Sequence, residues 1–439
     1  MRGIDYTEAD SCTLMRQTNN WLLKLHPDCS TEVVDFDLMA VFIMQETNNN
    51  IHITRLIKAV IETFSDPGQP RTTRQNQLLH ASLLVQQTIK NYEKDSQVQS
   101  GLRMPFCLRY PNLVSVRNHA RSLEMQCRIL DPKKMVVLLD ENGICVGVGL
   151  PPYPTPAQGS VHVAHDTRAL NSLKEMVAKK KKSVGVLDKK IQFTADSIKI
   201  DELQGHGSSW KDNQQIPALP NPLRECPNTD DTEAITKLQN ETTFYSKLNY
   251  AINCAFLPKS TSVAMKAIEY LNEHGSDSVK EKLQLEKNMI VASRTASVNT
   301  QIHTHRDKKN ALLFDSVFFF GNHYGGEFLL PSLGVAYTGL HGYSFHGPFR
   351  ILYHGVAKFY FKEDLKEPPQ RFSLAMWSRE SSFTAVARHA AYFLKKNKIY
   401  SNPNYWLPLY PKYQSSLVQT HFEDFKKSSR MRTKAKNRS

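Results

Sequence analysis

The chain has 439 residues, of which 40% are hydrophobic and 22% are charged. This composition is typical of a folded globular protein and excludes collagen, coiled coil and wholesale disorder. No stretch approaches the roughly 18 consecutive apolar residues of a membrane-spanning helix, so the sequence predicts no membrane contact. Lys and Arg total 56 against 42 acidic residues, a net charge of +14, which favours a polyanionic partner such as nucleic acid.

Residues 1–100 are predicted to form a helical region. Apolar residues recur at helical spacing around Trp21, between Phe42 and Phe64, and again between Gln75 and Tyr92. The segment contains no motif that carries chemistry, so it is expected to act as a scaffold.

A β-hairpin is predicted within residues 101–156. Met135–Leu139 and Ile144–Leu150 are apolar runs of strand length, and Asn142–Gly143 between them supplies turn residues that accept positive φ. A proline-rich connector ends the hairpin at residue 156.

Residues 157–228 are predicted to be an irregular insertion, because prolines are frequent in its second half. Its run of four lysines, 179–182, is expected to be a solvated loop, with contact to a DNA backbone as the lesser alternative.

Residues 229–380 are predicted to combine helices with a β-rich core. A helix is expected to start at Thr232, since apolar residues follow at every fourth position from Phe244 to Phe256. From Met289 to Trp377, short aromatic and β-branched runs alternate with Gly and Pro turns, which is typical of a barrel or a double-sheet jelly roll. The fold class predicted is therefore α+β.

Residues 381–439 are predicted to be a C-terminal helix followed by a basic tail. Between Arg388 and Ser439 there are 12 basic and 2 acidic residues, so this segment carries +10 of the net charge. Such a tail indicates nucleic-acid contact or nuclear targeting, and we expect the protein to be nuclear.

A metal site is predicted in the β-rich block. His305 and Asp307 are two residues apart, so on a strand both side chains leave the same face. His354, on a later strand, is the preferred third ligand, with His341 and His346 as competitors. Two histidines and one carboxylate form the facial triad of non-haem iron(II) oxygenases, which leaves three coordination positions open.

Arg371 and Ser373 are predicted to bind a cosubstrate. They lie two residues apart on one strand face, a short distance after His354. A guanidinium group with a nearby hydroxyl suits the distal carboxylate of a dicarboxylic acid.

These motifs resemble the TET/J-binding-protein dioxygenases, in which Fe(II) and 2-oxoglutarate serve to oxidise the methyl group of 5-methylcytosine or thymine in nucleic acid. The resemblance lies in the compact pattern His305-Arg306-Asp307-Lys308-Lys309-Asn310, Gly325-Gly326, His354 and Arg371-x-Ser373, over about 90 residues. It implies a double-stranded β-helix (jelly-roll) core flanked by helices, with residues 101–156 as the start of the catalytic domain. It also implies that His305, Asp307 and His354 ligate Fe(II), that Arg371 and Ser373 bind 2-oxoglutarate, and that O2 is the oxidant.

The resemblance further implies contacts to a methylated base flipped out of DNA. Asn310 matches the residue that hydrogen-bonds the base, Trp377 falls where an aromatic ring stacks on it, and Arg379 stands where those enzymes carry a histidine. The departure at Arg379 leaves the base open: 5-methylcytosine is favoured, with thymine or N6-methyladenine as alternatives. The cysteine-rich zinc module of animal TET proteins is absent, so no structural zinc is expected.

Two other functions remain open at this point. One is a 2-oxoglutarate oxygenase that acts on a protein or small molecule and uses its basic tail only as a nuclear signal. The other is a DNA-binding module without activity, against which the intact triad argues.

Overall fold

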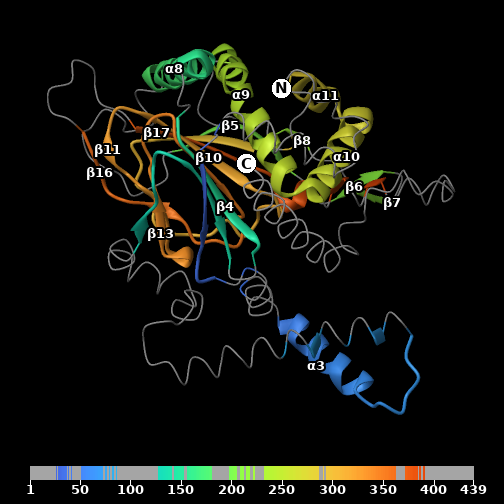
Figure 1. Cartoon of the computed structure of the whole chain (residues 1–439). Helices are drawn as coiled ribbons and strands as arrows, with labels where there is room; N and C mark the ends of the chain where they lie inside the picture. Colours follow the sequence, from blue (N-terminus) through green and yellow to red (C-terminus); the bar gives the residue numbers. More distant parts are fainter. Residues whose placement is uncertain are drawn as a thin grey trace.

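The structure is a computed structural model of the whole chain, with mixed α and β elements (Figure 1). It describes residues 28–36, 51–72, 127–140, 143–152, 156–179, 197–204, 208–211, 214–217, 221–222, 232–285, 293–361 and 371–383, together with single positions near these ranges. The helices predicted around Trp21 and the basic tail lie outside the described residues.

The larger sheet contains nine strands and forms the centre of the molecule (Figure 1). Its strands, in spatial order, are β1 (Cys29–Val33), β3 (Met135–Leu139), β4 (Cys145–Leu150), β14 (Ser344–Gly347), β10 (Asp315–Gly321), β17 (Arg371–Trp377), β9 (Ser293–Val298), β5 (Ser197–Gln204) and β8 (Asn221–Pro222).

The predicted hairpin is confirmed, since β3 and β4 pair antiparallel. The prediction of a purely helical N-terminal region is wrong, because Cys29–Val33 is a strand that pairs parallel to β3. A parallel pair needs a long connection, so the partner of β1 lies about a hundred residues away and local periodicity carries no sign of it. Helix α3 (Ile51–Phe64) agrees with the predicted helix between Phe42 and Phe64.

Four shorter strands form a second sheet, and two ribbons complete the β structure. The second sheet runs β15 (Gly355–Val356), β12 (Phe328–Leu330), β13 (Val335–Tyr337) and β2 (Arg128–Ile129). A 3-10 turn, η1 (Pro331–Leu333), connects β12 to β13. The ribbons are β11 (Tyr324–Gly325) with β16 (Phe359–Tyr360), and β6 (Ser208–Lys211) with β7 (Gln214–Pro217).

Aromatic side chains fill the space between the two sheets. Phe328 of the second sheet lies 5.8 Å from Phe319 and 5.5 Å from Phe345 of the larger sheet, measured between ring centroids. Gly149 is required on β4, because a Cβ there would lie 2.6 Å from the ring of Tyr337. One face of the large sheet is therefore buried under the small one.

The opposite face of the large sheet is covered by helix α9 (Thr232–Phe256). The amide of Asn249 donates to Ser316 on β10 at 2.6 Å, and Arg294 on β9 donates to Thr242 at 3.3 Å. The helix predicted from Thr232 is thus confirmed, and the sheet separates it from the second sheet.

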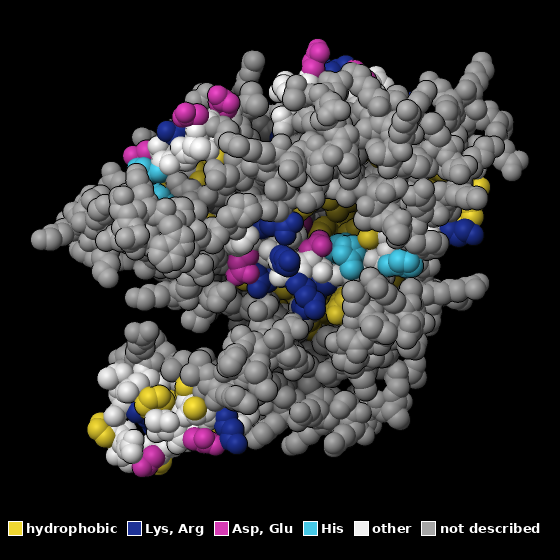
Figure 2. All heavy atoms as spheres, turned by 180° about the vertical axis from the view of Figure 1, so that it is seen from behind, with side chains coloured by type: hydrophobic (Ala, Val, Ile, Leu, Met, Phe, Trp, Pro, Cys, Tyr) yellow, Lys and Arg dark blue, Asp and Glu magenta, His cyan; other side chains and the backbone are white. Residues whose placement is uncertain are grey.

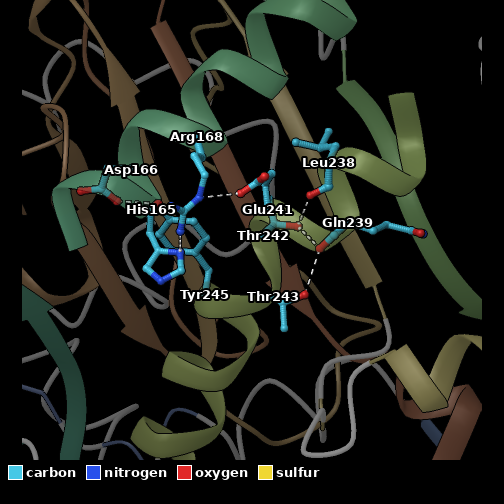
Figure 3. A network of polar contacts seen from close by, with 9 residues as sticks. All are labelled: His165, Asp166, Arg168, Leu238, Gln239, Glu241, Thr242, Thr243 and Tyr245. Atoms are coloured by element: carbon cyan, nitrogen blue, oxygen red, sulfur yellow. Dashed lines mark hydrogen bonds and ion pairs between the residues drawn. The ribbon is translucent and has the colours of Figure 1, made fainter. Parts of the chain in front are cut away.

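Helix α8 (Pro156–Lys179) packs on α9 and corrects the prediction for residues 157–228. The described residues of that segment are not irregular, because they form α8 and the strands β5 to β8. Figure 3 shows the joint between the helices, where Tyr245 donates to Asp166 at 2.5 Å and Arg168 pairs with Glu241 at 2.9 Å.

Helices α10 (Pro258–His274) and α11 (Asp277–Leu285) enclose a smaller apolar cluster beside the sheet. Phe383 and Val386 join this cluster, and residues 380–383 are helical, in agreement with the start of the predicted C-terminal helix. None of the helices in the described ranges is long and apolar enough to span a bilayer.

Candidate metal centre

His305 and His354 face each other as an antiparallel bridge outside the named strands. Each backbone N–H donates to the carbonyl of the other residue, at 2.8 and 2.9 Å. Residues directly opposite in such a pair project from the same side, and the two imidazole centroids are 4.3 Å apart. The backbone pairing therefore brings the two rings together although the residues are 49 positions apart in the chain.

Both imidazoles are oriented by backbone carbonyls. His305 donates from Nδ1 to the carbonyl of His303 at 2.8 Å, and His354 donates from Nδ1 to the carbonyl of Leu352 at 3.2 Å. Because Nδ1 carries the proton in each ring, Nε2 is left with its lone pair. This is the arrangement that metal-binding histidines use to fix tautomer and ring orientation.

Asp307 completes the group from the turn that follows His305. Its Oδ1 lies 3.6 Å from Nε2 of His305, and its Oδ2 lies 3.6 Å from Nε2 of His354. The ligand atoms of the three residues all lie within 4.8 Å of one another. Among the described residues, these three form the group of His, Cys or carboxylate side chains whose ligand atoms lie close enough to one another to hold a metal ion.

The surroundings set the protonation of the ligands. His354 is buried, which holds its pKa well below the ordinary value, and the nearby His305 lowers it further. Desolvation raises the pKa of the Asp307 carboxyl, whereas the charges of His305 and Arg379 oppose that rise. A neutral imidazole is the form that binds metal, so burial keeps His354 in its metal-binding form.

Arg371 is the largest of the fully buried side chains, with 1% of its surface exposed. Its guanidinium lies over the rings of Phe319 and Phe359, at 5.7 and 5.3 Å, and its Nε has no hydrogen-bond partner among the described residues. Burial lowers its pKa to about 10, so the group stays charged at neutral pH. Its Nη2 donates to the carbonyl of Gly326 at 3.5 Å. The charge of Glu327 also acts on the guanidinium, but no carboxylate among the described residues forms an ion pair with it. A buried charge without such a pair is costly, so the site fits an anionic ligand.

Glycine makes room for this guanidinium. Gly326 has a φ of +72°, and a Cβ at that position would lie 3.0 Å from Nε of Arg371. The second residue of the Gly325–Gly326 pair therefore has a steric reason to lack a side chain.

Ser373 and Trp377 share the face of β17 from which Arg371 projects, since they are two and six residues further along the strand. Ser373 is buried, and Trp377, at the end of the strand, is half-buried. The aromatic layer links this face to the metal ligands: Phe319 contacts Phe328, whose ring lies 5.6 Å from that of His354.

Asn310 and Arg379 lie beside the metal-binding turn, paired with each other as a bridge. Asn310 is buried, and its amide nitrogen donates to Asp315 at 2.9 Å. The structure thus brings Asn310 and Arg379 to Asp307, but the Asn310 amide N–H is already engaged within the protein.

The remaining histidines of the region take other places. His323 donates to the carbonyl of Gly339 at 2.9 Å, and its pKa is lowered to about 4, mainly by burial and also by Arg371. His346 is fully buried between Ser316 and Ser344, on the face of the sheet that α9 covers. His341 is exposed, and its Nδ1 accepts a hydrogen bond from the backbone of Gly321.

Sequence reasoning missed one group at the site, the buried carboxyl of Asp315. Burial raises its pKa well above the ordinary value, while the hydrogen bond from Asn310 opposes that rise. In the sequence, Asp315 is an acidic residue that precedes an apolar run, and no feature of the sequence distinguishes it from the other acidic residues.

Basic side chains lie close to His305 and Asp307. Lys308 and Lys309 are exposed, and Arg306 and Arg379 are half-buried. Figure 2 shows a group of basic side chains beside histidine and acidic side chains near the middle of the face it draws. We call Arg306, Lys308, Lys309 and Arg379 the basic rim.

Comparisons with known proteins add little to this geometry. No protein-family model matches the chain, and no curated protein does. A solved structure described as NgTET1 in complex with 5mC DNA is similar at 15% identity, over 62% of this chain and 92% of that one, with a TM-score of 0.31. Similarity at this level decides neither the fold nor the activity.

Proposed function

We propose that the chain is an Fe(II)- and 2-oxoglutarate-dependent dioxygenase that oxidises the methyl group of 5-methylcytosine in DNA. The observation that carries the proposal is the convergence of His305, Asp307 and His354, whose ligand atoms lie within 4.8 Å of one another. Two imidazole nitrogens and one carboxylate oxygen are the donor set of the facial triad. The residues present therefore fit iron(II), and the two facing sheets would be a double-stranded β-helix around it.

The buried guanidinium of Arg371 supports 2-oxoglutarate as the cosubstrate. The distal carboxylate of a dicarboxylic 2-oxo acid would pair with this guanidinium, which has no ion-pair partner among the described residues, and Ser373 on the same strand face offers a further hydrogen-bond donor. The rings of Phe319 and Phe359 exclude water around the guanidinium, which strengthens such a pair.

When bound, iron(II) would supply the activation of dioxygen, through coordination positions that the protein leaves open. The chain's own part is to hold and orient. Backbone carbonyls point Nε2 of both histidines toward Asp307. Phe349 stacks on His354 at 4.4 Å, which keeps water away from that side of the ring.

The basic rim supports DNA as the substrate. Lys and Arg side chains at the mouth of a site attract phosphates and make affinity fall with salt. The methyl group of a paired base cannot reach a buried centre, so the base would be flipped, at a cost of a few kcal/mol. The half-buried Trp377 is our candidate to stack on the base, with Asn310 and Arg379 as its polar contacts. The basic tail would add phosphate contacts and direct the protein to the nucleus.

The test is nucleoside mass spectrometry after incubation of the full chain with Fe(II), ascorbate, 2-oxoglutarate and duplexes that carry 5-methylcytosine, N6-methyladenine or only unmodified bases. We expect 5-hydroxymethylcytosine, with formyl and carboxyl products as oxidation is repeated. His305→Ala and Asp307→Ala should abolish all products.

The alternatives each predict a different result. Product from thymine or N6-methyladenine alone would support the proposed oxidation chemistry but identify a different target base. No product from any duplex, with substrate-independent decarboxylation of 2-oxoglutarate, would indicate an oxygenase with a non-nucleic-acid substrate. DNA binding without any turnover would contradict the proposal.

A further inference from the structure

We propose that Asp315 is a positioning residue for the metal site: through Asn310 it holds the turn that carries Asp307, and that turn is itself hydrogen-bonded to the segment that leads to His354. The inference rests on the proposed function only in that it takes His305, Asp307 and His354 to bind a metal. It concerns a residue that touches none of the expected ligands or substrates.

Asp315 is the first residue of β10 and is 3% exposed. Its Oδ2 accepts a hydrogen bond from the side-chain amide of Asn310 at 2.9 Å. A buried carboxyl needs such a partner, and here the partner belongs to the turn that carries Asp307. The carboxyl therefore ties that turn to the start of β10.

The first segment is the turn that carries Asp307. The backbone N–H of Asn310 donates to the carbonyl of Asp307 at 2.9 Å, which closes the turn. Asp315 holds the side chain of the residue at the end of this turn. The bond to Asn310 thus limits how far the turn, and with it the Asp307 carboxylate, can move.

The second segment leads from Phe349 to His354. The carbonyl of Phe349 accepts the backbone N–H of Asp307 at 3.0 Å, and its ring stacks on the imidazole of His354 with 4.4 Å between centroids and 30° between planes. A shift of Phe349 would therefore displace two of the three ligands. Because Asp315 holds the turn that carries Asp307, the bond from Asp307 to Phe349 passes that restraint on to the second segment.

Metal affinity is sensitive to such support, because a site must be held to within about 0.5 Å of its working geometry. Loss of a group that orients metal ligands costs about 10- to 100-fold in affinity. Asp315 could also act through its charge, as an anion near a dication. Replacement by Asn separates the two roles, because the carboxamide keeps the shape and an acceptor oxygen but removes the charge.

The experiment measures binding of Co(II) alone to the full chain by titration under visible absorption, whose bands report both affinity and coordination geometry. For Asp315→Ala we expect an affinity loss of about 10-fold or more, with an altered spectrum. For Asp315→Asn we expect a loss of no more than about threefold and an unchanged spectrum, because an acceptor for Asn310 remains.

The matched control is Asp166→Ala. Asp166 is also a sheltered carboxyl with a hydrogen bond from another element, Tyr245 at 2.5 Å, but it lies in the joint between α8 and α9 (Figure 3). Its removal should lower stability and leave Co(II) affinity unchanged.

Co(II) affinity of Asp315→Ala equal to that of Asp166→Ala would overturn the positioning role. An equal loss in Asp315→Asn and Asp315→Ala would also overturn it, in favour of charge. If Asp315→Ala does not fold, Asn310→Ala removes the donor of the same hydrogen bond. Unchanged Co(II) affinity in that variant refutes the proposal. Co(II) binding that His305→Ala does not weaken would instead refute the proposed metal site, so the two failures are distinguishable.

Discussion

Arg371 is the residue whose surroundings most clearly call for a ligand. Only the planar guanidinium can present two parallel donors to a carboxylate, and the rings of Phe319 and Phe359 leave its orientation little freedom. We expect Arg371→Lys to keep the charge yet raise the KM for 2-oxoglutarate at least about tenfold, with a smaller effect on kcat.

The same change should weaken equilibrium binding of 2-oxoglutarate to the metal-loaded protein, measured by calorimetry. Arg294→Lys is the control, because Arg294 is also buried, at 2% exposure, and lies on the neighbouring strand β9 with its side chain on the α9 face. A rise in KM of the same size in both variants would contradict the assigned role of Arg371.

Asn299 holds the start of the strand that carries Arg371. It has a φ of +46°, its N–H donates to the carbonyl of Arg371 at 2.8 Å, and its Oδ1 accepts the N–H of Arg371 at 2.8 Å. Asn is one of the few side chains that tolerates this backbone region.

Asn299→Ala should lower the free energy of unfolding by about 2–4 kcal/mol, from a lost acceptor and an unfavourable φ together. Asn299→Gly should cost about 1–2 kcal/mol less than Ala, because only the acceptor is lost. Urea unfolding of both variants measures the difference, and equal losses would show that the positive φ carries no strain here.

At this scale, sequence reasoning found residues whose chemistry shows in their type and spacing, such as His305, Asp307 and Arg371. It did not find Asn299 or Asp315. The role of Asn299 depends on a partner 72 positions away, and the role of Asp315 on two segments that only the folded chain brings together. Neither residue type is rare enough to be noticed alone.

At the scale of elements, a buried polar chain joins α9 to two strands of the large sheet. Asn249 donates to Ser316, and the ring of His346 is hydrogen-bonded to Ser316 through Nδ1 and to Ser344 through Nε2. Every member has a partner, which is the condition for a buried polar network to stabilise a fold. The joint fixes the helix against β10 and β14.

This joint makes stability depend on pH. Burial, with a smaller contribution from His26, lowers the pKa of His346 to about 3, so the folded chain binds fewer protons than the unfolded one. The contribution of His346 to the free energy of unfolding is fully present above about pH 6.5 and is lost as the pH falls toward 3. At pH 5 the loss from this residue is about 2 kcal/mol. Urea unfolding of His346→Gln at pH 7 and pH 5 should show a pH effect smaller by that amount, and an undiminished effect would place its origin elsewhere.

Sequence patterns predicted elements well where the signal was local. The hairpin of β3 and β4 has its turn and both strands within 16 residues, and α9 has its own periodic face. Strand β1 was missed because its partner β3 lies about a hundred residues further along the chain. The order of the nine strands follows from such distant pairings, so no local pattern contains it.

At the scale of the whole molecule, the uneven charge predicts how DNA would bind. Lys308 and Lys309 are exposed beside Asp307, so the double variant Lys308→Glu/Lys309→Glu should weaken DNA binding and flatten its salt dependence by up to about 2 in the slope of log K against log salt. Fluorescence anisotropy with a labelled duplex at several salt concentrations measures both. Lys58→Glu is the control, since Lys58 is an exposed lysine of α3, and an equal effect there would show that only net charge matters.

The mixed α+β class was predictable from composition and period, because helical and alternating segments follow each other along the chain. The division into domains stays a prediction.

The parallel strand at the rim of the large sheet limits how the protein can be shortened. Cys29–Val33 covers the outer side of β3, whose five residues are all buried and apolar. Expression from a start codon placed after Phe36 would expose the edge of β3. An exposed edge strand of apolar residues pairs with other chains. Recombinant fragments that omit β1 should therefore accumulate as aggregates or exchanged dimers, whatever the state of the candidate metal site.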